Sequence, residues 1–197
     1  MKIRKTYILS ITLIALLFFS CATFSKKQFR KEVKHLKKQS IIELNGDYSF
    51  NPTKKYSNLN KIDPEFNNAY QLMVNNNHKD RIKFDSIQKN KNEYFINLNI
   101  QGDNELRLKV FKNTGLIKDT IILGKYKKGM FYLDNNFLDC HGIPFIFGGC
   151  RNNKRRIGLM KNGNLIINEA VSNEGALLLI FGSGYRYNIS YEYKLKQ

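Results

Sequence analysis

Two cysteines and a histidine share one short run, Asp139-Cys-His-Gly-Ile-Pro-Phe-Ile-Phe-Gly-Gly-Cys150. Three chemistries are possible: a disulfide, a thiol paired with an imidazole base, or a metal site. Neighbouring residues of an extended chain point to opposite faces, so Cys140 and His141 would not face each other. Their spacing with Cys150 also matches no recognised zinc pattern. The glycines and Pro144 would instead allow a hairpin that brings the two Cα atoms within ~7 Å, as a disulfide requires.

The disulfide is therefore the favoured interpretation of this run, and closing a loop of about ten residues would be worth ~3 kcal/mol. No other motif in the sequence predicts catalysis. The chain has no Gly-x-Ser-x-Gly, no phosphate-binding glycine loop and no His-Glu-x-x-His, and Gly182-Ser-Gly184 reads as a turn. We assign no catalytic residue, metal or cofactor, although the 16 acidic residues leave a glycosidase-type carboxylate pair open.

The N-terminus has the pattern of a secretory signal. Lys2, Arg4 and Lys5 form a cationic head, and residues 7–20 follow without a charge. A positive segment before a short apolar run is typical of a signal peptide, which we place at residues 1–20. Export would deliver the chain to an oxidising compartment, where two cysteines of the body are expected to pair.

The end of this leader, Leu17-Phe-Phe-Ser-Cys21, resembles the lipobox of bacterial lipoproteins. The resemblance implies that Cys21 receives a diacylglycerol, that the leader is cut before it, and that the new N-terminus is acylated, for example with palmitate. It further implies a lipid-anchored protein of the bacterial cell envelope, in the outer membrane and facing the periplasm. Two alternatives remain open: cleavage by an ordinary signal peptidase near Cys21, or an uncleaved anchor, since residues 7–24 carry no charge.

The residues that follow the leader are basic. Removing residues 1–20 leaves 197 − 20 = 177 residues with 33 − 3 = 30 Lys and Arg against 16 acids, a net charge of +14. Export argues against nucleic acid as the partner of this charge, and favours anionic lipid headgroups or a polyanionic envelope polymer. We expect residues 21–40 to form a membrane-proximal linker whose basic residues lie at the membrane surface: Lys26, Lys27, Arg30, Lys31, Lys34, Lys37 and Lys38.

Phe29, Val33 and Leu36 in this linker have the spacing of one side of a helix, which predicts a basic amphipathic helix on the membrane. A solvated tether is the alternative. The single domain that follows, residues 41–197, is mostly of period two. Its clearest strand is the last, where Tyr185, Tyr187, Ile189, Tyr191, Tyr193 and Leu195 alternate with polar residues.

Short strands separated by turns predict an all-β fold, an antiparallel meander that closes into a barrel of about eight to ten strands. Gly46-Asp-Tyr48 resembles the Gly-x-aromatic element of lipocalin-like barrels. We expect strands at 41–50 and 176–181 and one short helix near 63–75, where Asp63-Pro-Glu65 is a helix start. An open sandwich or curled sheet is the alternative, and an outer-membrane barrel is disfavoured because the outward faces are polar.

This architecture predicts that the barrel binds a small apolar or amphiphilic molecule. The alternative is a structural or interaction module of the cell envelope with a filled core and no ligand. An enzyme is the least favoured of the three, because no chemical motif supports it.

Overall fold

The structure is a computed structural model of the chain and describes residues 22–25, 29–57, 68–74, 93–143, 147–177 and 181–196. These residues form a 3-10 helix, η1 (Lys38–Leu44), and a short α-helix, α2 (Ala69–Val74). They also form ten strands: β1 (Gly46–Ser49), β2 (Lys54–Tyr56), β3 (Tyr94–Gln101), β4 (Glu105–Lys112), β5 (Gly115–Lys127), β6 (Met130–Leu133), β7 (Phe137–Ile143), β8 (Phe147–Leu159), β9 (Leu165–Leu177) and β10 (Phe181–Tyr193).

All ten strands belong to one antiparallel sheet, which confirms the predicted all-β class. The strand order is β1-β3-β4-β5-β6-β8-β9-β10-β2, and β7 pairs with β8 beside this path. Alternation sets the faces as predicted: Tyr94, Ile96, Leu98 and Ile100 of β3 are buried, and the residues between them are not. Neighbours in sequence are mostly neighbours in the sheet, because short turns such as Asn162-Gly163 connect them.

The strand ladders do not close the sheet into the predicted lipocalin-like barrel. β1 and β2 end the path and do not pair with each other. Near the chain end, Tyr48 and Leu195 form an isolated bridge, and Lys194 and Lys196 exchange backbone hydrogen bonds of 2.8 Å with Ser49 and Asp47. The sheet is therefore open, as in the alternative interpretation.

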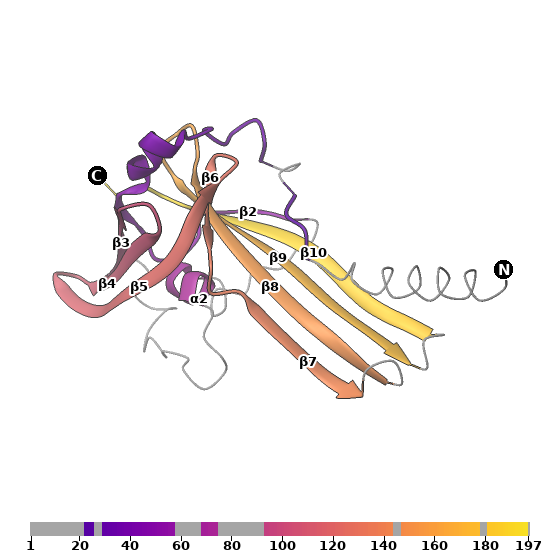
Figure 1. Ribbon diagram of the computed structural model, residues 1–197. Helices are drawn as coiled ribbons and strands as arrows, with labels where there is room; N and C mark the ends of the chain where they lie inside the picture. The colour runs from indigo at the N-terminus through magenta and orange to yellow at the C-terminus, as the bar shows by residue number, and fades with distance from the viewer. Residues whose placement is uncertain are drawn as a thin grey trace.

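The strands of the sheet differ in length. β8, β9 and β10 have 13 residues each, whereas β1 has 4 and β6 has 4. The excess length extends away from β3–β6 and both helices as a four-stranded sheet (Figure 1). We call this part the projecting sheet and define it as β7 with residues 147–153, 171–177 and 181–187.

The main core lies between the sheet and the two helices. Buried side chains of every strand from β3 to β6 and of β8, β9 and β10 meet Leu44 of η1 and Leu72 and Met73 of α2. Within α2, the Gln71 amide donates to Asn68 Oδ1 at 2.9 Å, an N-cap. Tyr70 and Met73 are buried, as expected for a helix near 63–75, but the predicted start at Asp63 lies outside the described residues.

One predicted strand is right only in part and another is wrong. Of the strand expected at 41–50, only Gly46–Ser49 form a strand, β1. Residues 41–44 belong to η1, because Ile41 and Leu44 are three residues apart and a 3-10 turn buries both on one side. The apolar run 176–181 is not a strand of its own. It contains the end of β9 and the start of β10, and both strands continue through the polar residues on either side of the run. Residues 178–180 lie outside the described part. Ile82 and Phe84 alternate with Lys83 and Asp85, which also predicts a strand, but these residues lie outside the described part.

Candidate functional site

The residues immediately after Cys21 lie against the sheet. The Ser25 amide donates to Asn188 Oδ1 at 2.8 Å, and Asn188 Nδ2 donates to the Thr23 carbonyl at the same distance. Ala22 is buried, with 5% of its surface exposed. The side chain of Asn188 on β10 thus binds the main chain as a neighbouring strand would.

Arg156 on β8 completes this contact. Its Nη2 donates to the Ser25 carbonyl at 3.3 Å, its Nη1 to the Tyr132 hydroxyl at 2.9 Å, and its guanidinium lies 4.3 Å from the centre of the Phe24 ring. Its Nε donates to Asn168 Oδ1 at 2.8 Å. Burial lowers the pKa of Arg156, but these partners satisfy the charged form.

These contacts lie on the sheet face opposite the main core. Arg156, Asn168 and Ser190 are cross-strand partners in one row, and the next row, Ile157, Ile167 and Tyr191, belongs to the core. Successive residues of a strand point to opposite faces. Residues 22–25 therefore cover the face away from the core, which we call the outer face.

Residues 29–37 continue over the outer face. Phe29 is 2% exposed and packs with Met130, Met160 and Ile166. Val33 forms a bridge with Met160, and the Lys34 amide donates to the Leu159 carbonyl at 2.8 Å. Leu36 is fully buried in the main core. The predicted helix is not formed at 29–36: Phe29 and Leu36 are buried in the body, and Val33 is partly buried against it.

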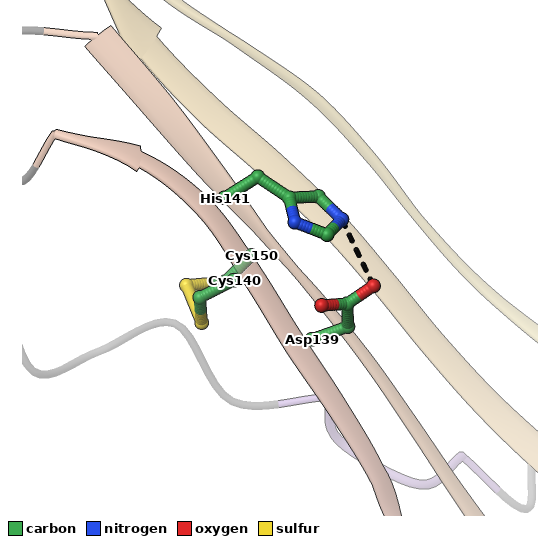
Figure 2. The surroundings of a disulfide bond; sticks show 4 residues. All are labelled: Asp139, Cys140, His141 and Cys150. Carbon is green, nitrogen blue, oxygen red and sulfur yellow. Dashed lines mark ion pairs between the residues drawn. A yellow bond between two sulfur atoms is a disulfide. The ribbon is translucent and has the colours of Figure 1, made fainter.

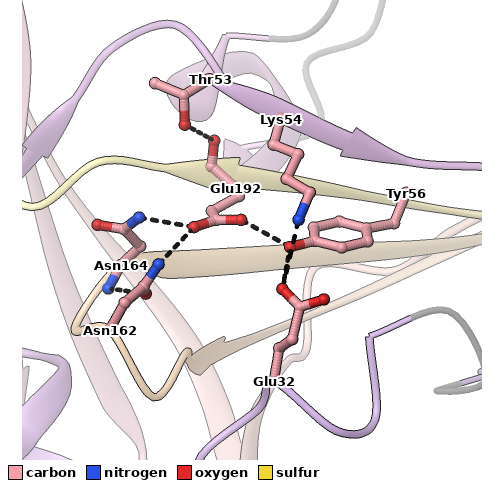
Figure 3. Close-up of polar contacts among 7 residues, drawn as sticks. All are labelled: Glu32, Thr53, Lys54, Tyr56, Asn162, Asn164 and Glu192. Atoms are coloured by element: carbon pink, nitrogen blue, oxygen red, sulfur yellow. Dashed lines mark hydrogen bonds and ion pairs between the residues drawn. The ribbon is translucent and has the colours of Figure 1, made fainter.

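A cluster of polar side chains fixes this segment to the sheet (Figure 3). The Tyr56 hydroxyl lies 2.8 Å from Glu32 Oε2 and 2.7 Å from Glu192 Oε2, so it joins the N-terminal segment to β2 and β10. The other oxygen of Glu192 accepts from Asn164 Nδ2 at 2.6 Å and from Asn162 Nδ2 at 2.9 Å. The carboxylate of Glu192 is therefore buried but has a donor at both oxygens.

Hydrogen bonding outweighs burial at this carboxylate. Burial works to raise the pKa of Glu192, but the hydrogen bonds from Asn164, Asn162 and Tyr56 hold it below the ordinary value. Burial and the two carboxylates raise the pKa of Tyr56 well above that of a free phenol. The cluster favours an ionised Glu192 beside a protonated Tyr56, whose single proton is donated either to Glu192 or to Glu32 of the N-terminal segment.

We expect Tyr56→Phe to lower the free energy of unfolding by about 1.5–3 kcal/mol, because the hydrogen bond from its hydroxyl proton to a carboxylate is lost. The lowered pKa of Glu192 means that its contribution is present above the unfolded-state value of ~4.3 and lost as the pH falls through the folded-state value. Denaturant titrations between pH 7 and pH 2 should therefore show a shallower acid loss in the variant. Tyr185→Phe, at a residue 50% exposed, is the control, and equal curves for wild type and Tyr56→Phe would contradict the assignment.

The predicted membrane-surface residues fall into two groups. Arg30, Lys31, Lys34, Lys37 and Lys38 are exposed on the segment that covers the sheet. Two of them form surface ion pairs, Lys34 with Glu43 and Lys38 with Asp103. Cys21, Lys26 and Lys27 lie outside the described residues, so their roles stay predictions.

Cys140 and Cys150 are joined in a disulfide, as predicted (Figure 2). They are direct cross-strand partners of β7 and β8, with Cα atoms 4.1 Å apart. His141 lies on the other side of the strand, where its Nε2 is 2.9 Å from Asp139 Oδ2. The imidazole is 79% exposed and faces away from both sulfurs, so this run does not pair a thiol with a base.

Other chemistry is limited in the described part of the chain. No group of three His, Cys, Asp or Glu residues there could hold a metal ion, and no helix there has the length and apolar character to cross a membrane. The buried Arg155 donates to the Leu72 and Asn135 carbonyls at 3.1 and 2.7 Å, and burial lowers its pKa to about 10. It thereby links β8 to α2, which is a structural role.

Comparisons with protein-family models, with characterised proteins and with solved structures find no match to this chain. The site therefore rests on its own geometry. Sequence reasoning missed Asn188, Arg156, Tyr56 and Glu192, which hold the N-terminal segment. Asn188, Arg156 and Glu192 occupy positions of strands whose polar character predicts a solvent-facing side chain. The pattern does not distinguish a polar residue that binds water from one that binds the backbone of a distant segment.

Proposed function

We propose that the protein is an exported lipoprotein of the bacterial cell envelope, anchored through an acylated Cys21, and that its body is an interaction module with a filled core. The observation that supports this proposal is that side chains fill the core face of the sheet. A ligand-binding barrel keeps that face free for its ligand. Here aromatic residues with at most 1% exposure, Tyr48, Phe50, Phe131 and Tyr193, meet apolar side chains from η1 and α2 on that face.

The leader pattern and the disulfide support the cellular location. Cross-strand cysteines pair stably in an oxidising envelope and stay reduced in the cytosol. The exposed basic residues of the segment that covers the sheet suit anionic lipid headgroups or an anionic envelope polymer as partners. Both features fit a body that works close to the membrane surface in the periplasm.

Acyl labelling tests the anchor. We expect an alkyne-palmitate to label the wild-type protein and to leave Cys21→Ser unlabelled, because the diacylglycerol thioether needs that sulfur. The double variant Cys140→Ser, Cys150→Ser is the matched control. It should keep the label, because it retains Cys21 and the two cysteines that it lacks are paired with each other in the wild-type protein. Label retained on Cys21→Ser would refute the anchor.

A fluorescent lipid probe separates the module from the ligand-binding barrel. The filled core predicts no saturable binding of the probe to the purified body. Saturable binding with a stoichiometry of one would favour the barrel that carries a small apolar ligand.

A further inference from the structure

The side of the projecting sheet that continues the core face is polar and aromatic. Tyr187 packs against the main core, and side chains two residues further along a strand point the same way. Figure 2 shows Asp139 and His141 on one side of β7 and the disulfide on the other. Cross-strand pairing defines two rows beyond Tyr187: Asp139, Arg151, Asn173 and Tyr185, followed by His141, Gly149, Gly175 and Ser183. We call these two rows together with Tyr187 the tyrosine face.

Two stacked tyrosines border this face. The rings of Tyr185 and Tyr187 are parallel within 9°, and their centres are 5.8 Å apart. Tyr187 is partly buried at the edge of the core, whereas Tyr185 is 50% exposed. Asn173 Nδ2 donates to the Tyr185 hydroxyl at 3.3 Å and helps to hold the ring. Because Tyr187 covers one side of the Tyr185 ring, the exposed side faces along the strand toward Ser183.

The backbone is accessible beside this exposed ring. Gly149 and Gly175 occupy the two central positions of the second row, and both are partly exposed. His141 and Ser183 at the two ends of the row are exposed. A flat ring that stacks on Tyr185 would therefore lie over backbone and would not meet a side chain at the centre of the row.

Arg151 supplies a positive charge to the tyrosine face. It is exposed and takes part in none of the ion pairs among the described residues. Asp139 is already bound to His141, with 2.9 Å between Oδ2 and Nε2. Arg151 can therefore bind an acidic group from outside, and it lies two strand spacings, about 10 Å, from Tyr185.

These features suit a sugar better than a protein. An aromatic face carries a partial negative charge, and the C–H groups on one side of a pyranose ring are weakly positive and stack on it. Sugar hydroxyls both donate and accept hydrogen bonds, and the side chains of Asn173 and Ser183 can do the same. A protein interface has an apolar centre, whereas neither row contains an aliphatic side chain.

We propose that the tyrosine face binds a glycan chain that carries carboxylates, with one pyranose ring stacked on Tyr185 and an acidic substituent bound to Arg151. Arginine binds a carboxylate through two parallel hydrogen bonds. The net charge of +14 after residues 1–20 (30 basic minus 16 acidic residues) adds long-range attraction. Residues 22–25 contact the outer face and so leave the tyrosine face uncovered. The inference rests on the proposed location in the envelope, where such glycans lie.

A single tryptophan in place of Tyr185 tests the site. The chain has no tryptophan, so Tyr185→Trp keeps an aromatic face and adds one fluorescent reporter. Leu138→Trp, at a residue 66% exposed on the outer face, is the matched control. The full-length proteins in detergent are titrated with a tetrasaccharide of alternating N-acetylglucosamine and N-acetylmuramic acid. We expect a saturable change in the emission of Tyr185→Trp that is at least fivefold larger than that of Leu138→Trp. Equal changes, or no saturable change at 185, would overturn the inference.

A neutral glycan tests the role of the charge. Chitotetraose lacks only the lactyl carboxylates, and we expect it to bind Tyr185→Trp at least tenfold more weakly. Adding Arg151→Ala should weaken binding of the acidic tetrasaccharide at least tenfold and leave that of chitotetraose within twofold. Arg30→Ala removes the same charge from an exposed position on the N-terminal segment and should change neither affinity more than twofold. Equal affinities for the two glycans would overturn the inference.

A second acidic glycan identifies the source of the ligand. Oligogalacturonate has its carboxylates on the sugar ring carbons, so tighter binding of this probe points to an acidic polysaccharide, and tighter binding of the tetrasaccharide points to the cell wall. Unchanged melting temperatures show that the variants fold. Variants at the glycines are avoided, because a Cβ at Gly149 would lie 2.9 Å from the Glu174 carbonyl oxygen.

The premise and the inference fail in different ways. Acyl label retained on Cys21→Ser overturns the anchor and leaves the titration unchanged, because the glycan contacts do not involve residue 21. A flat titration of Tyr185→Trp in a protein that takes up the label overturns the glycan site and leaves the anchor in place.

Discussion

Phe131→Ala is expected to lower the free energy of unfolding by about 3–5 kcal/mol, the usual cost of truncating a fully buried phenylalanine. Phe131 of β6 has no exposed surface. Its ring packs so closely on β5 that a Cβ added to Gly124 would lie 2.4 Å from it. The neighbouring backbone has no side chain with which to fill the space, so the site cannot collapse easily. Chemical denaturation of the purified body measures the loss.

The same variant tests whether the core is filled. Leu123→Ala on β5, at a residue 54% exposed, is the matched control and should change the stability by less than about 0.5 kcal/mol. A dry cavity lined by apolar groups binds small apolar molecules, so benzene should raise the melting temperature of Phe131→Ala and leave the wild type unchanged. If benzene or a lipid probe stabilises the wild type instead, the interior already has room, and the ligand-binding barrel becomes the better proposal.

The sequence predicted the strands well because burial on one face imposes a period of two. β3 and the last part of β10 show this directly: the apolar positions of β3 are those that the core covers, and Ile189, Tyr191 and Tyr193 of β10 are buried, whereas Tyr185 on the projecting sheet is 50% exposed. The same signal failed at residues 41–44. A four-residue apolar cluster fits a strand and a 3-10 turn equally well, and only the position of the core beside Ile41 and Leu44 decides between them.

Two larger features, the open sheet and the docking of the N-terminal segment, could not be predicted from local sequence patterns. Closure of the sheet depends on whether the two strands that end its path meet, and no local pattern shows that β1 and β2 do not pair. Docking of residues 22–25 depends on single contacts across more than 130 positions, such as Ser25 with Asn188. The spacing of Phe29, Val33 and Leu36 did indicate an apolar side, but the spacing does not identify the surface that covers it. The disulfide was predictable because its two partners are close in sequence and glycines surround them.

Replacing Cys140 and Cys150 by serine together is expected to open the projecting sheet without unfolding the core. Within the described residues β7 pairs only with β8, and the disulfide that joins them closes a loop of about ten residues, worth ~3 kcal/mol in the chain-entropy model. Amide protection of β7 should therefore fall by up to about a hundredfold, since 1.36 kcal/mol corresponds to a factor of ten. Hydrogen exchange read by mass spectrometry resolves residues 137–143 from β3 and β4, whose amides should keep their protection.

Reductant distinguishes the loss of the covalent bond from the effect of the serines. It should reproduce the exchange of the double variant in the wild-type protein and change nothing further in the variant. Equal exchange of oxidised and reduced protein would mean that the backbone ladder alone holds β7. A matching loss in β3 would mean that the projecting sheet and the core unfold as one unit, so that the disulfide stabilises the whole domain rather than the projecting sheet alone.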